Sequence, residues 1–411
     1  MEVLSPKCAG LDVHRDTVVA CSRIASGDEV KREVRTFGTT TKELMALSAW
    51  LAEHGVTHVA MEATGVYWRP VWHVLEGDFE LVLANAMHIK NVPGRKTDVS
   101  DAMWIADLLA HGLIRASFVP PEPVQDLRAL TRTRKQLVRE RASHVQRIDK
   151  ILQDANLKLG SVISDILGLS GRRILDALVA GEEDPEKLVT HVDVRVRAPR
   201  ADIVEALRGK VTAQHRFLLK LHLGQVDGLQ KAIDAIDAEV GDRLLPFRDA
   251  AERLKGIPGV SDVAAAAIVS EIGVDMSRFP TVGHLISWAG LCPKNDESAG
   301  KRRSNRLRKG APWLKTLLVQ AAWSAARTKS SYFHAQFLRL KARRGPRKAI
   351  MAVAASLLTA AYAMLKNGTA YKDLGADHFS RIERIKTANR LLQKLGDLGF
   401  DTRGVRDLQA A

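Results

Sequence analysis

Four acidic residues occupy positions in which a charge needs a partner. Asp12 lies within the apolar run CAGLDV, and Glu62 lies near the end of the apolar run VAMEAT. A carboxylate in a buried strand is costly unless it is paired or bound to a metal ion. Asp98 and Asp101 are three residues apart at the start of an expected helix, which places both side chains on one face. Together, the four positions predict a metal-binding carboxylate site.

The chemistry of such a site depends on how the strands pair. If the strand of Glu62 lies beside the strand of Asp12, the two acids become neighbours, and the helix of the second acidic pair can pack across them. Two divalent ions about 4 Å apart would then activate the attacking oxygen of a phosphodiester reaction and stabilise the leaving oxygen. Mg²⁺ suits carboxylates and substrate phosphates. Taken alone, the second pair also fits a helix N-cap and a first-turn acid. The nearby His14 and His88 receive no metal role.

A serine and a dense group of cations mark the C-terminal half. Ser298 directly precedes the stretch that contains Lys301, Arg302, Arg303, Arg306, Arg308 and Lys309. A second cluster contains Arg339, Lys341, Arg343, Arg344, Arg347 and Lys348. A serine hydroxyl becomes a nucleophile only when it loses its proton and cations match the charge on the phosphate. The residues alone make Ser298 more often an ordinary turn residue, whereas the basic loop predicts salt-sensitive phosphate binding.

A candidate helix-hairpin-helix precedes this serine. The run IPGVSDVAAAAIVSEIG has a turn at Pro258 and Gly259 followed by a helix of small residues. Such a turn presents backbone N–H groups and a helix N-terminus to a phosphate. The same pattern also fits a plain packing element. Because basic sequence follows, we expect phosphate binding at Gly259.

The elements that position these residues fall into four regions. Residues 1–119 alternate strand-like and amphipathic runs in the order β-β-β-α-β-α-β-α, which predicts a mixed sheet flanked by helices. Residues 120–254 contain one basic helix to about residue 160 and a second from about 201, which should pair antiparallel. Their apolar spacing leaves both intramolecular packing and an oligomer-forming coiled coil open. Residues 255–376 should be mostly helical, and the tail at 377–411 should form one further helix.

Composition points to a polyanionic partner. The formal charge is +15 and the pI is near 9.8, which favours nucleic acid. We expect no apolar run to reach the roughly 18 residues of a spanning helix, and the start MEVLSPKCAG lacks the features of a signal peptide, so a cytoplasmic protein without membrane contact is predicted. The three cysteines have no metal-binding spacing and are interpreted as buried or incidental thiols.

The order of the motifs resembles one family. GLDVHRD, MEATG and KTDVSDA, followed by GIPGV, WAGLCP, ESAGKRR and RKG, resemble the insertion-sequence-110 transposases, which include pilin-gene-inverting recombinases, over roughly residues 8–376. The resemblance implies an α/β ribonuclease-H-like (RuvC-like) N-terminal domain. It also implies that the metal ligands are Asp12, Glu62, Asp98 and Asp101, and that Ser298 bonds covalently to DNA. It further implies a structured guide RNA that pairs with donor and target DNA.

These observations predict a Mg²⁺-dependent transposase or recombinase that cuts and rejoins double-stranded DNA, working as a dimer or tetramer. One alternative is a Holliday-junction-type endonuclease that uses the carboxylates alone, with water as the nucleophile. Another is a nucleic-acid-binding protein without catalytic activity, in which the acids are structural.

Overall fold

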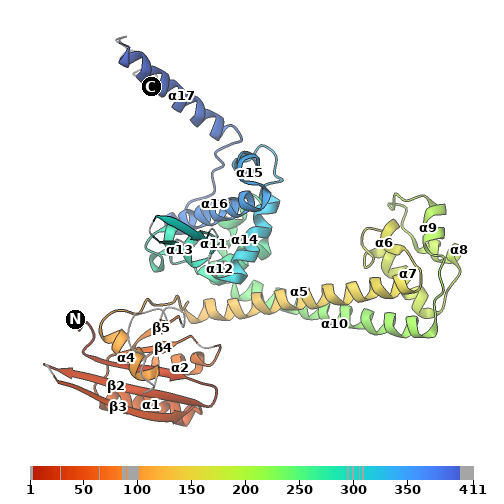
Figure 1. Ribbon diagram of the computed structural model, residues 1–411. Helices are drawn as coiled ribbons and strands as arrows, with labels where there is room; N and C mark the ends of the chain where they lie inside the picture. The colour runs from red at the N-terminus through yellow and green to blue at the C-terminus, as the bar shows by residue number, and fades with distance from the viewer. Residues whose placement is uncertain are drawn as a thin grey trace. The chain divides into compact units, whose positions relative to one another are not determined.

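The computed structural model describes residues 3–27, 29–63, 65–85, 89, 101–293, 296–298, 300–304, 306–307 and 310–398 (Figure 1). The chain divides into two compact units, an N-terminal unit at Met1–Val119 and a C-terminal unit at Pro120–Ala411.

The N-terminal unit is built on a five-stranded sheet. Its strands are β1 (Lys7–Val13), β2 (Thr17–Ser26), β3 (Glu29–Gly38), β4 (His58–Glu62) and β5 (Glu80–Ala84). Their spatial order is β3-β2-β1-β4-β5. The first three strands form an antiparallel meander, and β4 and β5 run parallel to β1. The sheet is therefore mixed, as the sequence predicted, with β1 at its centre.

Helices cover both faces of this sheet. On one face, α1 (Thr41–Glu53) and α2 (Trp68–Leu75) bury Leu47, Leu51 and Leu75 against alternate residues of β1 and β4. On the other face, α4 (Asp101–Ala110) packs against the second set of alternate residues. The predicted order of strands and helices is confirmed, because the period-two alternation of the strands supplies an apolar residue to each face.

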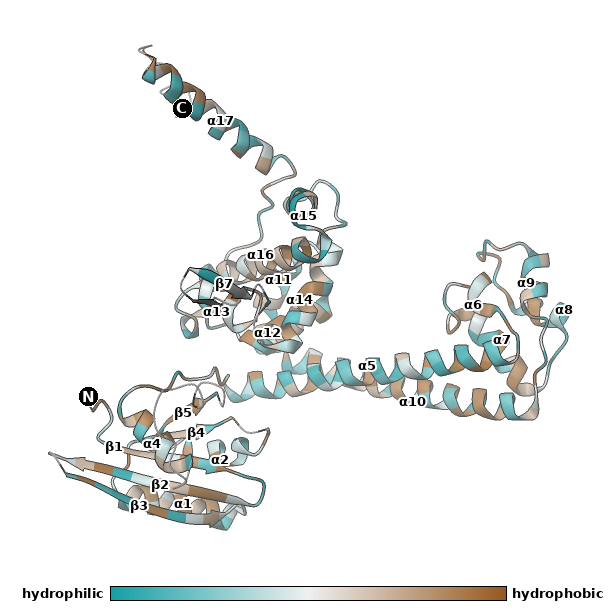
Figure 2. Cartoon of the chain, in the orientation of Figure 1, coloured by the Kyte–Doolittle hydropathy of each residue, from teal (hydrophilic) through white to brown (hydrophobic). Residues whose placement is uncertain are grey.

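The arms of the C-terminal unit are α5 (Glu122–Asp154) and α10 (Ala213–Arg243), which lie side by side (Figures 1 and 2). The contacts Asp126–Arg243, Arg134–Asp237 and His144–His222 run in opposite order along the two helices, so the arms pair antiparallel within one chain. Four short helices connect them: α6 (Leu159–Val162), α7 (Leu169–Ala180), α8 (Pro185–Leu188) and α9 (Arg200–Ala206).

The second arm is shorter than the sequence pattern predicted. The expected run from 201 to 254 is divided into α9, α10 and α11 (Arg248–Lys255). Gly209 lies in the first break, where an added Cβ would be 2.3 Å from the carbonyl oxygen of Ala155. Thr212 then begins α10 with a capping box, and Pro246 lies in the second break. The long helix that the apolar periodicity predicts is therefore interrupted by the backbone contact at Gly209, the cap at Thr212 and Pro246.

The rest of the C-terminal unit is mainly helical. It contains α12 (Asp262–Ile272), α13 (Val282–Trp288), α14 (Pro312–Ala325), α15 (Tyr332–Arg344), α16 (Pro346–Asn367) and α17 (His378–Asp397). A two-stranded hairpin, β6 (Asp296–Ser298) and β7 (Lys301–Ser304), occupies part of the stretch that the sequence predicted as a loop.

The helix α16 corrects one expectation about membranes. Its 22 residues include an 18-residue window of mean hydropathy 1.7, which is long and apolar enough to cross a bilayer. The expectation that no apolar run reaches this length is therefore wrong for α16. Half of that window is buried, with Val353, Ala354 and Leu358 inaccessible to solvent where α16 packs on α13, α14 and α15. A core helix of a folded protein meets the same length and hydropathy requirement.

Candidate active site

The N-terminal unit brings Asp12 and Glu62 to the same end of two adjacent strands. β1 and β4 pair in parallel with Gly10 opposite Ala60 and Leu11 opposite Met61. Asp12 and Glu62 are the next residues along these strands. Because side chains alternate between faces, Asp12 lies on the face of Gly10, and Glu62 lies on the face of Ala60. Both acids are partly exposed, unlike the buried residues that precede them. The pairing on which the sequence argument depended is therefore present.

The helix α4 runs over this same face with its N-terminus toward the acids. Leu4, just before β1, donates its N–H to the carbonyl of Ala110 at the end of α4. Farther along β1, an added Cβ at Gly10 would lie 2.2 Å from the carbonyl oxygen of Ala102. The strand and the helix therefore run in opposite directions. Asp101, the first residue of α4, lies toward the end of β1 that carries Asp12.

Two features hold α4 against the sheet. Gly10 provides the close approach, because any side chain there would overlap the backbone of the helix. Asp107 of α4 accepts hydrogen bonds at 2.8 Å from Nε of Arg23 and from Nη2 of Arg32. The Arg23 side chain is only 4% exposed, so the guanidinium side of this pair is shielded from solvent. The position of Asp101 is thus set by contacts of α4 with β1, β2 and β3.

Carboxylate oxygens at this edge fit a hard divalent cation by their chemistry. In the part of the chain that the structure describes, no three Asp, Glu, His or Cys side chains are close enough together to hold an ion. Asp98, the fourth predicted ligand, lies outside the described residues. The site is therefore a pair of neighbouring acids and a helix start, and the role of all four residues as ligands remains a prediction.

His14 is a neighbour of this site to which the sequence argument gave no role. Its Nε2 lies 3.2 Å from Oδ2 of Asp12, and the Asp12 side chain is 22% exposed. The two residues are separated by two positions at the end of one strand, so the alternation of side chains could have suggested the contact. An imidazole beside the carboxylate can orient it.

The buried thiols offer no nucleophile. Cys8 and Cys21 are inaccessible to solvent beneath α4, and burial raises the pKa of each thiol to about 11. Both therefore stay protonated near neutral pH, because the thiolate is the reactive form. The interpretation of these two cysteines as buried thiols is confirmed, and Cys292 is a partly buried free cysteine.

Ser298 lies in the C-terminal unit, at the end of β6. In the hairpin it pairs with Lys301, and Gly300 makes the turn with φ +71°. A bulge between Asp296 and Glu297 shifts the register. The predicted loop serine is therefore a strand residue beside the first cation of the basic stretch.

The cations of that stretch are only partly described. Lys301 and Arg306 are exposed, and the N–H of Arg306 donates to Oγ of Ser304. For Arg302 and Arg303 the structure describes the backbone in β7, and Arg308 and Lys309 lie outside the described residues. Their phosphate-binding role remains a prediction.

The turn at Gly259 packs inside the unit. It connects α11 to α12, which begins with the Ser261 side chain capping the N–H of Ala264. Gly259 has φ +84°, and an added Cβ would be 2.4 Å from the carbonyl oxygen of Ala321 in α14. The glycine is thus needed for a helix contact, which supports the packing alternative for this turn. Phosphate binding at Gly259 remains a prediction.

Two arginines predicted to bind nucleic acid end α15. Arg343 and Arg344 are exposed in its last turn, where the helix dipole also favours cations. Earlier in the same helix, Arg339 pairs with Glu383 of α17 at 3.0 Å. The second basic cluster therefore includes one cation that already has a partner.

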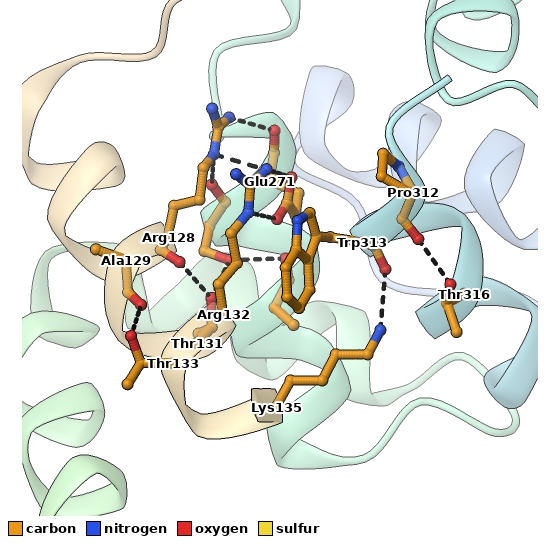
Figure 3. Close-up of polar contacts among 12 residues, drawn as sticks. Arg128, Ala129, Thr131, Arg132, Thr133, Lys135, Glu271, Pro312, Trp313 and Thr316 are labelled. Atoms are coloured by element: carbon orange, nitrogen blue, oxygen red, sulfur yellow. Dashed lines mark hydrogen bonds and ion pairs between the residues drawn. The ribbon is translucent and has the colours of Figure 1, made fainter. Parts of the chain in front are cut away.

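An ion pair with a buried carboxylate joins the first arm to α12 of the C-terminal unit (Figure 3). Nε and Nη2 of Arg132 donate to the two carboxylate oxygens of Glu271 in α12 at 2.7 and 2.8 Å. Arg128 donates to the carbonyls of Ser270 and Glu271. Glu271 is only 3% exposed. Sequence patterns do not reveal this pair, because its partners are 139 positions apart.

Comparison with known proteins agrees with the order of these regions. Residues 9–157 match the DEDD-type IS110 transposase family, and residues 251–338 match the family described as "Transposase IS116/IS110/IS902 family". The chain is 27% identical over 307 residues to the insertion element IS110 uncharacterized 43.6 kDa protein of Streptomyces coelicolor, covering 68% of this chain and 73% of the relative. It is 24% identical over 375 residues to the transposase for insertion sequence element IS1111A of Coxiella burnetii, covering 89% of this chain and 91% of the relative.

The first match spans most of the five-stranded sheet and the whole of the first arm, and the second spans the hairpin with Ser298. The chain therefore belongs to the IS110 family of transposases, and its activity is that of a DNA transposase.

Proposed function

We propose that this transposase cuts and rejoins DNA with a carboxylate site at Asp12, Glu62, Asp98 and Asp101 and with Ser298 as the nucleophile. The observation that carries the proposal is the parallel pairing of β1 and β4, which ends in Asp12 and Glu62 beneath the start of α4. The strand order β3-β2-β1-β4-β5 with an antiparallel first half also supports a ribonuclease-H-like domain. Bound Mg²⁺ would supply Lewis-acid stabilisation of charge on the phosphodiester oxygens.

The serine step conserves the energy of the broken phosphodiester bond in a phosphoserine linkage. The Ser298 hydroxyl oxygen attacks phosphorus, its proton leaves to a base, and the P–O bond to one DNA strand breaks. The products are a phosphoserine linkage and a free strand hydroxyl. A hydroxyl of another strand then attacks the phosphoserine and releases the serine, so no ATP is needed. The cations that follow Ser298 in the hairpin, beginning with Lys301, would neutralise the phosphate during both steps.

The partners belong to the same proposal. The basic arms and hairpin suit double-stranded donor and target DNA, and also a structured guide RNA that selects them by base pairing. A homo-oligomer, either a dimer or a tetramer, would supply two copies of the N-terminal unit and two of the C-terminal unit for strand exchange. The reaction would take place in the cytoplasm. Sequencing the RNA that co-purifies with the protein tests the guide directly.

Denaturing electrophoresis of end-labelled DNA tests the chemistry. Wild type with Mg²⁺ should give a protein–DNA adduct, whereas Ser298→Ala should bind DNA but give none. Ser304→Ala, in the other strand of the hairpin, is the matched control and should keep the adduct. Asp12→Asn and Glu62→Gln should abolish cleavage. Their affinity for DNA should change only a few-fold, because the basic surface binds the phosphates.

Each other outcome overturns a stated part of the proposal. An adduct that persists in Ser298→Ala and is lost in Ser304→Ala would move the nucleophile. Cleavage without any adduct would favour the junction endonuclease with water as the nucleophile, which the family match does not favour. Full cleavage by both carboxylate variants would exclude the metal site.

A further inference from the structure

The first arm carries four cations on one face. Arg128, Arg132, Lys135 and Arg139 are spaced at i, i+4, i+7 and i+11 along α5, which places them in one stripe. The stripe faces α12 and the first turn of α14, where the half-buried Trp313 lies (Figure 3). The basic hairpin with Ser298 shortly precedes α14 in the chain.

Two of the four cations are satisfied within the protein. Arg132 forms a bidentate pair with Glu271, the buried acid of α12. Arg128 donates to the carbonyls of Ser270 and Glu271, which are acceptors at the C-terminal end of that helix. The carboxylate of Glu271 is therefore already paired with Arg132.

The other two cations face an aromatic ring in place of an acid. Nζ of Lys135 lies 5.4 Å and Cζ of Arg139 lies 5.7 Å from the centre of the Trp313 ring. Lys135 also donates to the backbone carbonyl of Trp313 at 3.5 Å. Among the described residues, no carboxylate forms an ion pair with Lys135 or Arg139.

This arrangement is electrostatically incomplete. Lys135 and Arg139 are four residues apart on one helix, a spacing at which like charges repel. Burial, and after it the charge of Arg139, lowers the pKa of Lys135, and the opposing effect of the Glu271 charge does not cancel this shift. Attraction to the face of the ring offsets part of this cost but supplies no negative charge. An anion between the two cations would remove the repulsion.

We propose that Lys135, Arg139 and Trp313 bind a phosphate of a nucleic-acid backbone, so that the first arm itself forms part of the path of the nucleic acid. This deepens the proposed function and rests on it. The two cations would donate charge-assisted hydrogen bonds to the phosphate oxygens. The Trp313 ring would hold the two cations in place for this contact.

A nucleic acid fits this surface better than an acidic peptide. The chain has a net charge of +15, and the exposed Lys301 and Arg306 belong to the same C-terminal unit as this surface. A phosphodiester backbone presents evenly spaced charges along a surface of this kind. The Arg132–Glu271 pair holds the stripe on α12, so a phosphate on the arm would be bound at a fixed position relative to the rest of this region.

The test compares two matched double variants of full-length protein. Lys135→Gln with Arg139→Gln removes the two unpaired cations, and glutamine keeps the helix because its helix propensity is similar. Lys31→Gln with Lys42→Gln is the control, since these exposed lysines of the N-terminal unit lie outside the arms and form no ion pair among the described residues. The affinity for a labelled DNA duplex and for a labelled structured RNA is measured between low and moderate salt.

The proposal expects the affinity of the first variant to fall about tenfold or more at low salt. It also expects the slope of log affinity against log salt to fall by about one for each phosphate that is no longer neutralised. The control should stay within about twofold of wild type. A weaker affinity for DNA alone or for RNA alone identifies the strand that occupies the site.

Two outcomes would overturn the inference. If the first variant keeps the wild-type slope with both probes while wild type still forms the DNA adduct, the stripe is only a packing surface for Trp313, and the proposed function survives. If wild type binds neither probe, both the inference and the proposed function fail.

Discussion

Replacing Gly10 with alanine should displace α4 and separate the acids of the proposed site. The new Cβ would lie 2.2 Å from the carbonyl oxygen of Ala102 and 2.4 Å from the backbone nitrogen of Ala106. Ordinary contact begins near 3.4 Å. Both neighbours are backbone atoms, so the helix as a whole must move by about 1 Å. Overpacking of this kind destabilises a protein by about 1–3 kcal/mol.

The larger effect should be on activity. Asp101 begins α4, so the shift moves it relative to Asp12 and Glu62, which belong to the sheet. A misplacement of about 1 Å can lower the rate of a catalysed reaction about 100-fold. The assay is Mg²⁺-dependent cleavage of labelled DNA by Gly10→Ala, at a temperature well below the unfolding transition. Urea unfolding of the same preparation gives the decrease in stability.

Gly77→Ala is the matched control for this prediction. No atom lies within 4 Å of an added Cβ at Gly77, and its φ is not in the left-handed region. Its stability and cleavage should therefore stay close to those of wild type. Wild-type cleavage by Gly10→Ala would refute the reasoning that the seating of α4 on β1 aligns the site.

Three further predictions concern stability and binding. Arg132→Met should destabilise the C-terminal unit by about 2 kcal/mol in urea unfolding, because the buried carboxylate of Glu271 loses its bidentate hydrogen bonds and keeps, within the described part of the chain, only Arg128 at 3.9 Å, and a value near zero would contradict the role of this pair. Replacing Arg302, Arg303 and Arg306 with glutamine should weaken DNA binding and reduce the slope of log affinity against log salt. An unchanged slope would show that these arginines do not contact DNA. Hydrogen bonds to the Trp50 carbonyl and to Glu33 raise the pKa of His54. The contribution of His54 to the free energy of unfolding should therefore be complete below the unfolded-state pKa of about 6.5 and lost as pH rises through the folded-state pKa. His54→Gln should therefore lower the free energy of unfolding at pH 5 more than at pH 9, and equal effects at the two pH values would argue against the contact.

Much of the N-terminal unit could be predicted from local sequence. Strands were found by their alternation and helices by their 3.6-residue period, and both are properties of neighbouring residues. The acids at 12 and 62 stood out because each interrupts an apolar run. The sequence alone left open whether their two strands are adjacent, and the parallel register of β1 and β4 confirms that they are.

Elements with weaker local signals were harder to place. The second arm reads as one long helix, yet the close packing of Gly209 on Ala155 and the cap at Thr212 divide it. The stretch around Ser298 reads as a loop because it is rich in glycine and charge, yet cross-strand pairing with Lys301 makes it a hairpin. Strand pairing depends on residues that are not adjacent in the chain, so composition alone does not reveal it.

The sequence by itself determined which residue types were available for chemistry, their order, and the family to which that order belongs. Only the tertiary structure decided that α4 lies on β1 through Gly10, that His14 contacts Asp12, and that the Lys135 side of the first arm lies against Trp313. The physical reason is that secondary structure follows from the period of nearby side chains. A contact between elements depends on the shape and charge of surfaces that the chain brings together from more than a hundred residues apart, as it does for Arg132 and Glu271.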